Sequence, residues 1–282
     1  MKALNFLRPI SLKNKIRIGG HQDGGYVVYE KALAHTAQLL TYGVGWETTF
    51  EEHFRELTGK PVIMFDPTLY DKSIFEASHL NKLLGALKIS TSYSYLRKVK
   101  KLYFRHKDFE KKGLQFINEG LDTTQHDKYD TLSNHMKRFG LESKEILLKV
   151  DIESGEFGVF RQPQILDQLR NVNQLVIEWH DLKNRLHELK HALSLLDPAF
   201  ALVHIHGNNY GGTFKFYEAF SDSTKYMDLP DLIETTLVRR SRIDQDDLMQ
   251  EETSYPVKGL DFPNNPLSED IPIQFGVCHA FA

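Results

Sequence analysis

The chain has 282 residues, 41% of them hydrophobic, and a formal net charge of −3. This length allows one large α/β domain or two small ones, and the hydrophobic fraction is typical of a globular protein with a core. A weakly acidic chain lacks the basic footprint of a nucleic-acid binder, so we expect no nucleic-acid partner. The one cysteine, Cys278, excludes a disulfide framework. No stretch approaches the roughly 18 apolar residues of a membrane span, and the N-terminus has no signal-peptide core, so we expect a cytoplasmic protein.

Short apolar runs along the chain predict strands, and segments with a 3.6-residue periodicity predict helices. In chain order the expected strands are residues 26–29, 37–45, 61–66, 145–151, 174–180 and 200–207, and then an alternating, antiparallel one at 232–241. The expected helices are residues 47–57, 71–90, 131–141, 156–169 and 182–196, the fourth of them interrupted by Pro163. Residues 91–127 are expected to carry one helix and one strand. We divide the chain into a glycine-rich lead-in (1–36), a main domain (37–245) and a C-terminal tail (246–282).

Almost wholly apolar strands that alternate with helices predict a parallel sheet with helices on both faces. In such sheets ligands bind beyond the carboxyl ends of the strands, so the residues at those ends decide the chemistry. Five of the expected strands end on glycines, carboxylates or imidazoles. These residues are Gly43 and Gly45, Asp66, Asp151, Glu178 and His180, and His204 and His206.

The first two of these strand ends favour a nucleoside cofactor. Glycines at 43 and 45 let backbone N–H groups approach a ligand, whereas the alternative is a simple strand–helix turn. Asp66 follows at about the 20-residue spacing at which an acid accepts hydrogen bonds from ribose hydroxyls. The third glycine of the dinucleotide fingerprint is absent, which disfavours a pyrophosphate-containing cofactor such as NAD.

A series of motifs in a fixed order resembles the FkbM-type S-adenosylmethionine-dependent methyltransferases over about residues 17–240. The motifs are DGGYVV (23–28), TYGVGWETTFEEHF (41–54), VIMFDPT (62–68), TLSNHMKRFGL (131–141), LLKVDIESGEF (147–157), VIEWH (176–180), HIHGNNYG (204–211) and PDLIETTLVRR (230–240). The most specific of them usually reads Asp-Ile-Glu-Gly-Ala/Ser-Glu, and here Ser154 and Gly155 are swapped while all three acids are kept. The resemblance implies a Rossmann-like class I methyltransferase fold, with a mostly parallel sheet, an antiparallel last strand and helices on both faces.

The resemblance also implies S-adenosylmethionine as the cofactor, with its glycine turn at Gly43 and Gly45 and its ribose-binding acid at Asp66. Thr41 stands where such methyltransferases commonly have an acid, so Glu47, Glu51 or Asp23 is a candidate to meet the cofactor's ammonium group. The predicted cofactor-binding residues are Asp23, Tyr42, Gly43, Gly45, Glu47, Asp66 and Asp151.

Methyl transfer to a hydroxyl requires alignment of the reacting atoms and removal of the hydroxyl proton, either by a base or with the help of a divalent metal. The predicted catalytic residues are Asp151, His180 and His206. The candidate metal ligands are Asp151, Glu178, His180 and His206, whose carboxylates suit Mg²⁺ or Mn²⁺ and whose imidazoles favour Mn²⁺, Fe²⁺ or Zn²⁺. Each has a structural alternative, because a histidine in a strand is commonly a hydrogen-bonded core group. Glu153 is expected to border the site, Glu156 to be structural, and Glu234 could be either.

We therefore expect an O-methyltransferase acting on a hydroxyl of a sugar or glycan precursor, or of a secondary metabolite. Two alternatives stay open. One is a metal-dependent hydrolase that uses the acids and histidines without a nucleoside cofactor. The other is a methyltransferase-like binding protein without turnover. The acidic tail after residue 245 could be a lid. It could also be a dimer arm, in which case the protein would be a homodimer.

Overall fold

A computed structural model of the chain describes residues 4–69, 107–220, 223–250, 254–275 and 279–280. The predicted helix 71–90, Cys278 and much of the segment 91–127 lie outside these residues. Within them, no helix is both long enough and apolar enough to cross a bilayer.

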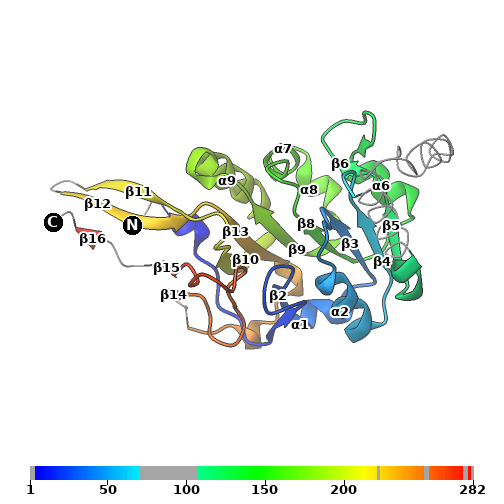
Figure 1. Ribbon diagram of the computed structural model, residues 1–282, viewed down its shortest axis with the longest axis horizontal. Coiled ribbons are helices and arrows are strands. Elements are labelled where there is room, and N and C mark those ends of the chain that lie inside the picture. The colour runs from blue at the N-terminus through cyan, green and yellow to red at the C-terminus, as the bar shows by residue number, and fades with distance from the viewer. Residues whose placement is uncertain (1–3, 70–106, 221–222, 251–253, 276–278, 281–282) are drawn as a thin grey trace, which may run out of the picture.

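A seven-stranded sheet forms the centre of the molecule, in the order β10-β13-β9-β8-β3-β4-β5 (Figure 1). Its strands are β3 (Gln38–Tyr42), β4 (Val62–Phe65), β5 (Leu114–Ile117), β8 (Ile146–Val150), β9 (Val172–Trp179), β10 (Phe200–Gly207) and β13 (Ile233–Arg239). All neighbours pair in parallel except β13, which lies antiparallel between β9 and β10. Numbered along the chain, the spatial order is 3-2-1-4-5-7-6. This is the Rossmann-like class I methyltransferase fold, as predicted. The antiparallel strand, β13, is the last of the seven along the chain.

Helices cover both faces of the sheet, as predicted (Figure 1). On one face lie α6 (Leu132–Arg138), α7 (Glu156–Phe160), α8 (Ile165–Gln168) and α9 (Leu182–Leu196), and on the other α1 (Glu30–His35) and α2 (Thr49–Thr58). Successive side chains of the central strands enter opposite cores, because strand side chains alternate. Leu148 and Val150 of β8 pack with α6 to α9, whereas Leu147 packs on the α2 side.

Local sequence explains where these helices end. Pro163 separates α7 from α8 because it cannot continue a helix. Gly59 ends α2 with a φ of 67°, the left-handed conformation that glycine adopts most readily. Thr131 caps α6 by accepting a hydrogen bond from the Asn134 N–H at 3.2 Å.

Smaller elements surround this core. The hairpin of β1 (Lys15–Ile18) and β2 (Tyr26–Tyr29) packs on the α2 side of the sheet. A second hairpin, β11 (Thr213–Phe220) and β12 (Ser223–Pro230), extends away from the sheet (Figure 1) and is not predicted from the sequence. The remaining elements are η1 (Asn5–Leu7), β6 (Gly120–Leu121), β7 (Tyr129–Asp130), η2 (Arg240–Arg242), η3 (Gln245–Asp247), β14 (Ser254–Tyr255), β15 (Ile273–Gln274) and β16 (His279–Ala280).

Candidate cofactor and acceptor site

A cavity of about 800 Å³ opens beyond the carboxyl ends of β3, β4 and β8. Its volume is within the range of pockets that enclose a small organic ligand. The fold brings all seven predicted cofactor-binding residues to its wall, although they come from four separate parts of the chain. These residues are Asp23, Tyr42, Gly43, Gly45, Glu47, Asp66 and Asp151.

In the glycine turn after β3, the backbone passes very close to the loop that follows β8. Gly43 has a φ of 72°, and a Cβ atom there would lie 1.4 Å from the carbonyl oxygen of Asp151. Its N–H donates to the Phe65 carbonyl at 2.9 Å, which ties the turn to the end of β4. Residue 43 therefore has to be glycine, because its φ is positive and because a side chain would overlap the Asp151 carbonyl.

Asp66 lies at the cavity wall with most of its surface covered, at 4% exposure. One carboxylate oxygen accepts hydrogen bonds from Thr68 N (2.7 Å), Thr68 Oγ1 (2.7 Å) and Leu69 N (3.1 Å). The other accepts from Gly45 N at 2.9 Å. The carboxylate thus shapes the turns after both β3 and β4 and also faces the space that a ligand would fill.

The three acids Glu51, Glu47 and Asp23, which the sequence offers as partners for an ammonium group, differ in where they lie. Thr41 Oγ1 donates to Glu51 Oε1 at 2.8 Å, and Glu51 is buried beneath the turn, with 1% exposure, where it does not line the cavity. Burial raises the pKa of Glu51, while nearby Lys149 acts against this rise. Glu47 and Asp23 both line the cavity. Of these three acids, Glu47 and Asp23 are therefore the two that lie at the cavity wall.

Tyr26 and Lys149 are among the wall residues that the sequence does not predict as parts of the site. Lys149 Nζ lies 3.5 Å from Asp151 Oδ2 and 4.9 Å from the centre of the Tyr26 ring. Burial opposes the charge of Lys149, but Asp151, Glu51 and Glu178 together raise its pKa. The signal available in the sequence is the spacing, because residues 149 and 151 of an extended segment face the same side.

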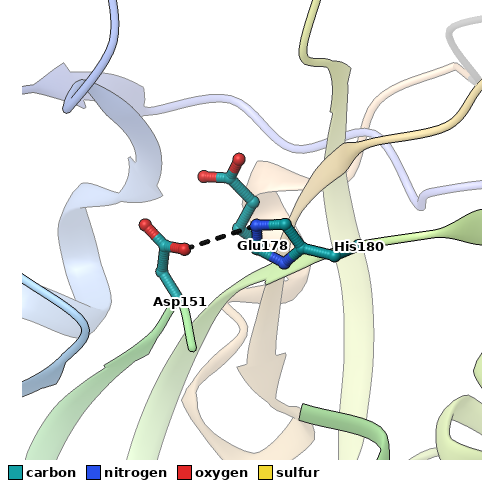
Figure 2. A group of neighbouring side chains, drawn as sticks. All are labelled: Asp151, Glu178 and His180. Atoms are coloured by element: carbon teal, nitrogen blue, oxygen red, sulfur yellow. Dashed lines mark ion pairs between the residues drawn. The ribbon is translucent and has the colours of Figure 1, made fainter. Parts of the chain in front are cut away.

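Asp151, Glu178 and His180 form one group beside the cavity (Figure 2). One potential ligand atom from each residue lies within 4.8 Å of the others. His180 Nε2 is 3.7 Å from Asp151 Oδ1, and Tyr26 Oη lies 3.1 Å from Glu178 Oε2 and 3.5 Å from Asp151 Oδ2. Burial raises the pKa of Asp151 and, with Asp151 beside it, raises that of Glu178 well above its ordinary value. Three of the four predicted metal ligands are therefore brought together.

The fourth, His206, lies elsewhere. His206 Nδ1 is 3.1 Å from Glu234 Oε2, and its Nε2 is 3.0 Å from Asp270 Oδ1 in the tail. Burial opposes protonation of His206, but its hydrogen bonds to Asp270 and Glu234 outweigh burial and raise its pKa to about 10. Glu234 also accepts from Asn264 Nδ2 at 2.6 Å. His206 and Glu234 thus belong to a buried ionic cluster that joins β10 and β13 to the tail.

The backbone around the swapped pair Ser154 and Gly155 has an unusual conformation. Glu153 and Ser154 have φ values of 54° and 79°, the left-handed region that suits glycine best, whereas Gly155 does not. A Cβ atom at Gly155 would lie 2.9 Å from Ile152 Cδ1. The loop after Asp151 therefore holds its carboxylates in a backbone shape that is unusual for the residues it contains.

The chain has little similarity to known proteins. No family model matches the chain, and no curated protein matches it. Among solved structures, the precorrin-6y C5,15-methyltransferase of Geobacter metallireducens GS-15 superposes over 74% of this chain and 84% of its own, with 9% identity and a TM-score of 0.35. The fibrillarin pre-rRNA processing protein of Methanococcus jannaschii covers 74% and 68%, with 11% identity and a TM-score of 0.36. The human methyltransferase 10 domain containing protein covers 72% and 71%, with 11% identity and a TM-score of 0.33. Both the sequence identities and the TM-scores are low. The fold is therefore defined by the strand order of the protein itself.

Proposed function

We propose that the protein is an S-adenosylmethionine-dependent O-methyltransferase of the FkbM type. Its acceptor would be a hydroxyl of a sugar or glycan precursor, or of a secondary metabolite. The observation that carries the proposal is the cavity at the carboxyl ends of β3, β4 and β8. It combines the glycine turn, Asp66 and Asp151 in a sheet of the class I methyltransferase order.

Each part of this wall has a role in the proposal. Asp66 would accept hydrogen bonds from the ribose hydroxyls, and Asp23 and Glu47 would face the ammonium group of the cofactor. Bound S-adenosylmethionine would supply a methyl group that is already electrophilic. The protein would then position the acceptor and remove its hydroxyl proton. Asp151, which lines the cavity, and His180, whose Nε2 lies 3.7 Å from Asp151 Oδ1, would serve this step, either as bases or as ligands of a divalent metal that lowers the pKa of the hydroxyl.

Binding of S-adenosylhomocysteine, measured by isothermal titration calorimetry, tests the cofactor assignment. We expect Asp66→Ala to weaken this binding about ten- to hundredfold, because hydrogen bonds to a charged group are worth about 1.5–3 kcal/mol. The matched control is Asp167→Ala on α8, whose side chain is 78% exposed and lies outside the cavity wall. Unchanged affinity in Asp66→Ala would remove the ribose assignment.

The same titration, together with metal-binding and methyl-transfer assays, separates the methyltransferase from the hydrolase and the binding protein. A wild-type protein that binds a divalent metal but no S-adenosylhomocysteine would favour the metal-dependent hydrolase. A protein that binds S-adenosylhomocysteine but transfers no methyl group to any hydroxyl acceptor would favour a binding protein. The group of Asp151, Glu178 and His180 is the observation that keeps the first alternative open.

A further inference from the structure

We propose that Asp151, Glu178 and His180 bind one divalent cation, Mn²⁺, at the edge of the cavity. The three side chains come from the ends of β8 and β9, which are adjacent and parallel in the sheet. One ligand atom from each lies within 4.8 Å of the others, and Figure 2 shows the imidazole edge of His180 turned toward Asp151. Asp151 also lines the cavity, so a cation held here would be next to a bound substrate.

His180 is the first indication that the group is incomplete without a ligand. The residue is 9% exposed, and its Nδ1 faces Glu156 Oε1 at 3.2 Å, so that Nε2 is the nitrogen left for another partner. Its Nε2 lies 3.7 Å from both Asp151 Oδ1 and Glu153 Oε2, which is longer than a hydrogen bond. A buried imidazole is normally satisfied, because leaving a polar group unpaired away from water costs free energy. A metal ion at Nε2 would satisfy it.

Glu156 is the second indication. Its carboxylate is completely buried, and its Oε2 has no hydrogen-bond partner among the described residues. The other oxygen, Oε1, accepts from Ile152 N at 2.7 Å and lies 3.2 Å from His180 Nδ1. A histidine that binds metal through one nitrogen commonly directs its other N–H at a carboxylate, which fixes the tautomer and the ring orientation. Glu156 is placed to do this for His180.

Polar neighbours also orient the two ligand carboxylates. Glu178 Oε1 accepts from Asn208 Nδ2 at 2.8 Å and Oε2 from Tyr26 Oη at 3.1 Å, which leaves a lone pair on each oxygen for a cation. Asp151 directs Oδ2 toward Lys149 and Oδ1 toward His180. Partners of this kind hold metal ligands in place in known sites.

Charge and donor type select the ion. Asp151 and Glu178 are two acids that share one nearby ammonium group, that of Lys149, so a divalent cation would offset charge that is otherwise costly to bury. Two carboxylate oxygens favour Mg²⁺, Ca²⁺ or Mn²⁺, whereas an imidazole favours later transition metals. Mn²⁺, Fe²⁺ and Zn²⁺ all accept both kinds of donor, and we choose Mn²⁺ because electron paramagnetic resonance detects its free ion directly. Its role, though not its binding, rests on the proposed methyl transfer: bound to the acceptor's hydroxyl oxygen, it would lower the pKa of that hydroxyl.

Mn²⁺ titration of the full chain, after treatment with a chelator, tests the site. Electron paramagnetic resonance measures the free Mn²⁺ that remains. We expect one bound Mn²⁺ per chain in the wild type and no binding in Asp151→Asn or His180→Gln, which are close in size to the natural residues. Glu156→Gln should weaken binding about ten- to hundredfold, as loss of an orienting carboxylate does. The control is His187→Gln, an exposed histidine of α9, which should bind as the wild type does.

Absence of Mn²⁺ binding in the wild type, or unchanged binding in Asp151→Asn or His180→Gln, would overturn the proposal. Circular dichroism of each variant establishes that it is folded. Calorimetry with S-adenosylhomocysteine on the same wild-type preparation keeps this result apart from the proposed function. Cofactor binding without Mn²⁺ would remove the metal site alone. Mn²⁺ binding without the cofactor would leave the metal site standing and remove the role in methyl transfer.

Discussion

Gly43 and Gly45 have the same left-handed backbone but very different surroundings. A Cβ at residue 43 would overlap the Asp151 carbonyl, whereas no atom lies within 4 Å of a Cβ at residue 45. We expect Gly45→Ala to lower the free energy of unfolding by about 1–2 kcal/mol, the cost of a left-handed alanine. Gly43→Ala should cost more than this, because β3 and β8 must also separate. Urea denaturation compares the two, and equal losses would contradict the steric argument.

Glu156 shows how little a single residue's type reveals. Its place in the first turn of α7, as the third of three acids in six positions, predicts a structural role at a helix N-terminus. The structure adds that its carboxylate is buried against His180 Nδ1 and the Ile152 N–H, and so connects the loop after Asp151 to the end of β9. Sequence spacing could not show this, because residues 156 and 180 approach each other only once β8 and β9 are paired.

At the scale of elements, the predicted strands and helices of the central sheet are confirmed where the structure describes them. The helix predicted at 182–196 coincides with α9, and the strand predicted at 200–207 coincides with β10. These segments carry a strong periodicity or a long apolar run, and they are buried as the pattern requires. The hairpin of β11 and β12 was missed because much of it extends away from the sheet, so burial imposes little hydrophobic pattern on it.

The outer half of this hairpin gives a test of which elements serve the site. Phe216 pairs with Met227, so residues 217–226 can be replaced by Asn-Gly, a pair that suits a two-residue hairpin turn. None of the hairpin residues that the structure describes lines the cavity, so we expect S-adenosylhomocysteine affinity to stay within about twofold of the wild type. Calorimetry measures this affinity, and circular dichroism monitors the fold. A large loss of affinity in a folded variant would show that the hairpin takes part in ligand binding.

At the scale of the whole molecule, the tail is joined to the lead-in through Asp247. Its carboxylate binds Lys31 Nζ at 2.8 Å, and it accepts from Tyr29 Oη at 2.7 Å and Asn14 Nδ2 at 3.0 Å. The Lys31 contact is the main reason why the pKa of Asp247 falls from 3.8 to about 2. Nearby, Lys13 N donates to the Asp247 carbonyl and Met249 N to that of Ser11. Segments more than 200 residues apart thus meet on one side of the sheet.

This contact predicts a dependence on pH. A carboxyl group whose pKa is lower in the folded state contributes stability above its unfolded pKa, and this stability is lost as the pH falls through the folded value. The contribution of Asp247 should therefore be complete above about pH 4 and disappear toward pH 2. Between these limits we expect Asp247→Asn to lose less stability than the wild type. Thermal melts at several pH values measure this, with exposed Asp167→Asn as the control; parallel curves for wild type and Asp247→Asn would contradict the assignment.

The sequence by itself determined the alternation of strands and helices, the antiparallel last strand, and the glycines and acids at the strand ends. Each of these features shows in local periodicity or in a short motif, because burial and backbone conformation constrain residues that are close together in the sequence. Only the tertiary structure decided which strand-end residues meet. It placed His180 beside Asp151 and Glu178, and it paired His206 with Glu234 and the tail instead. The order of strands in the sheet sets these distances, and that order results from the packing of the whole chain.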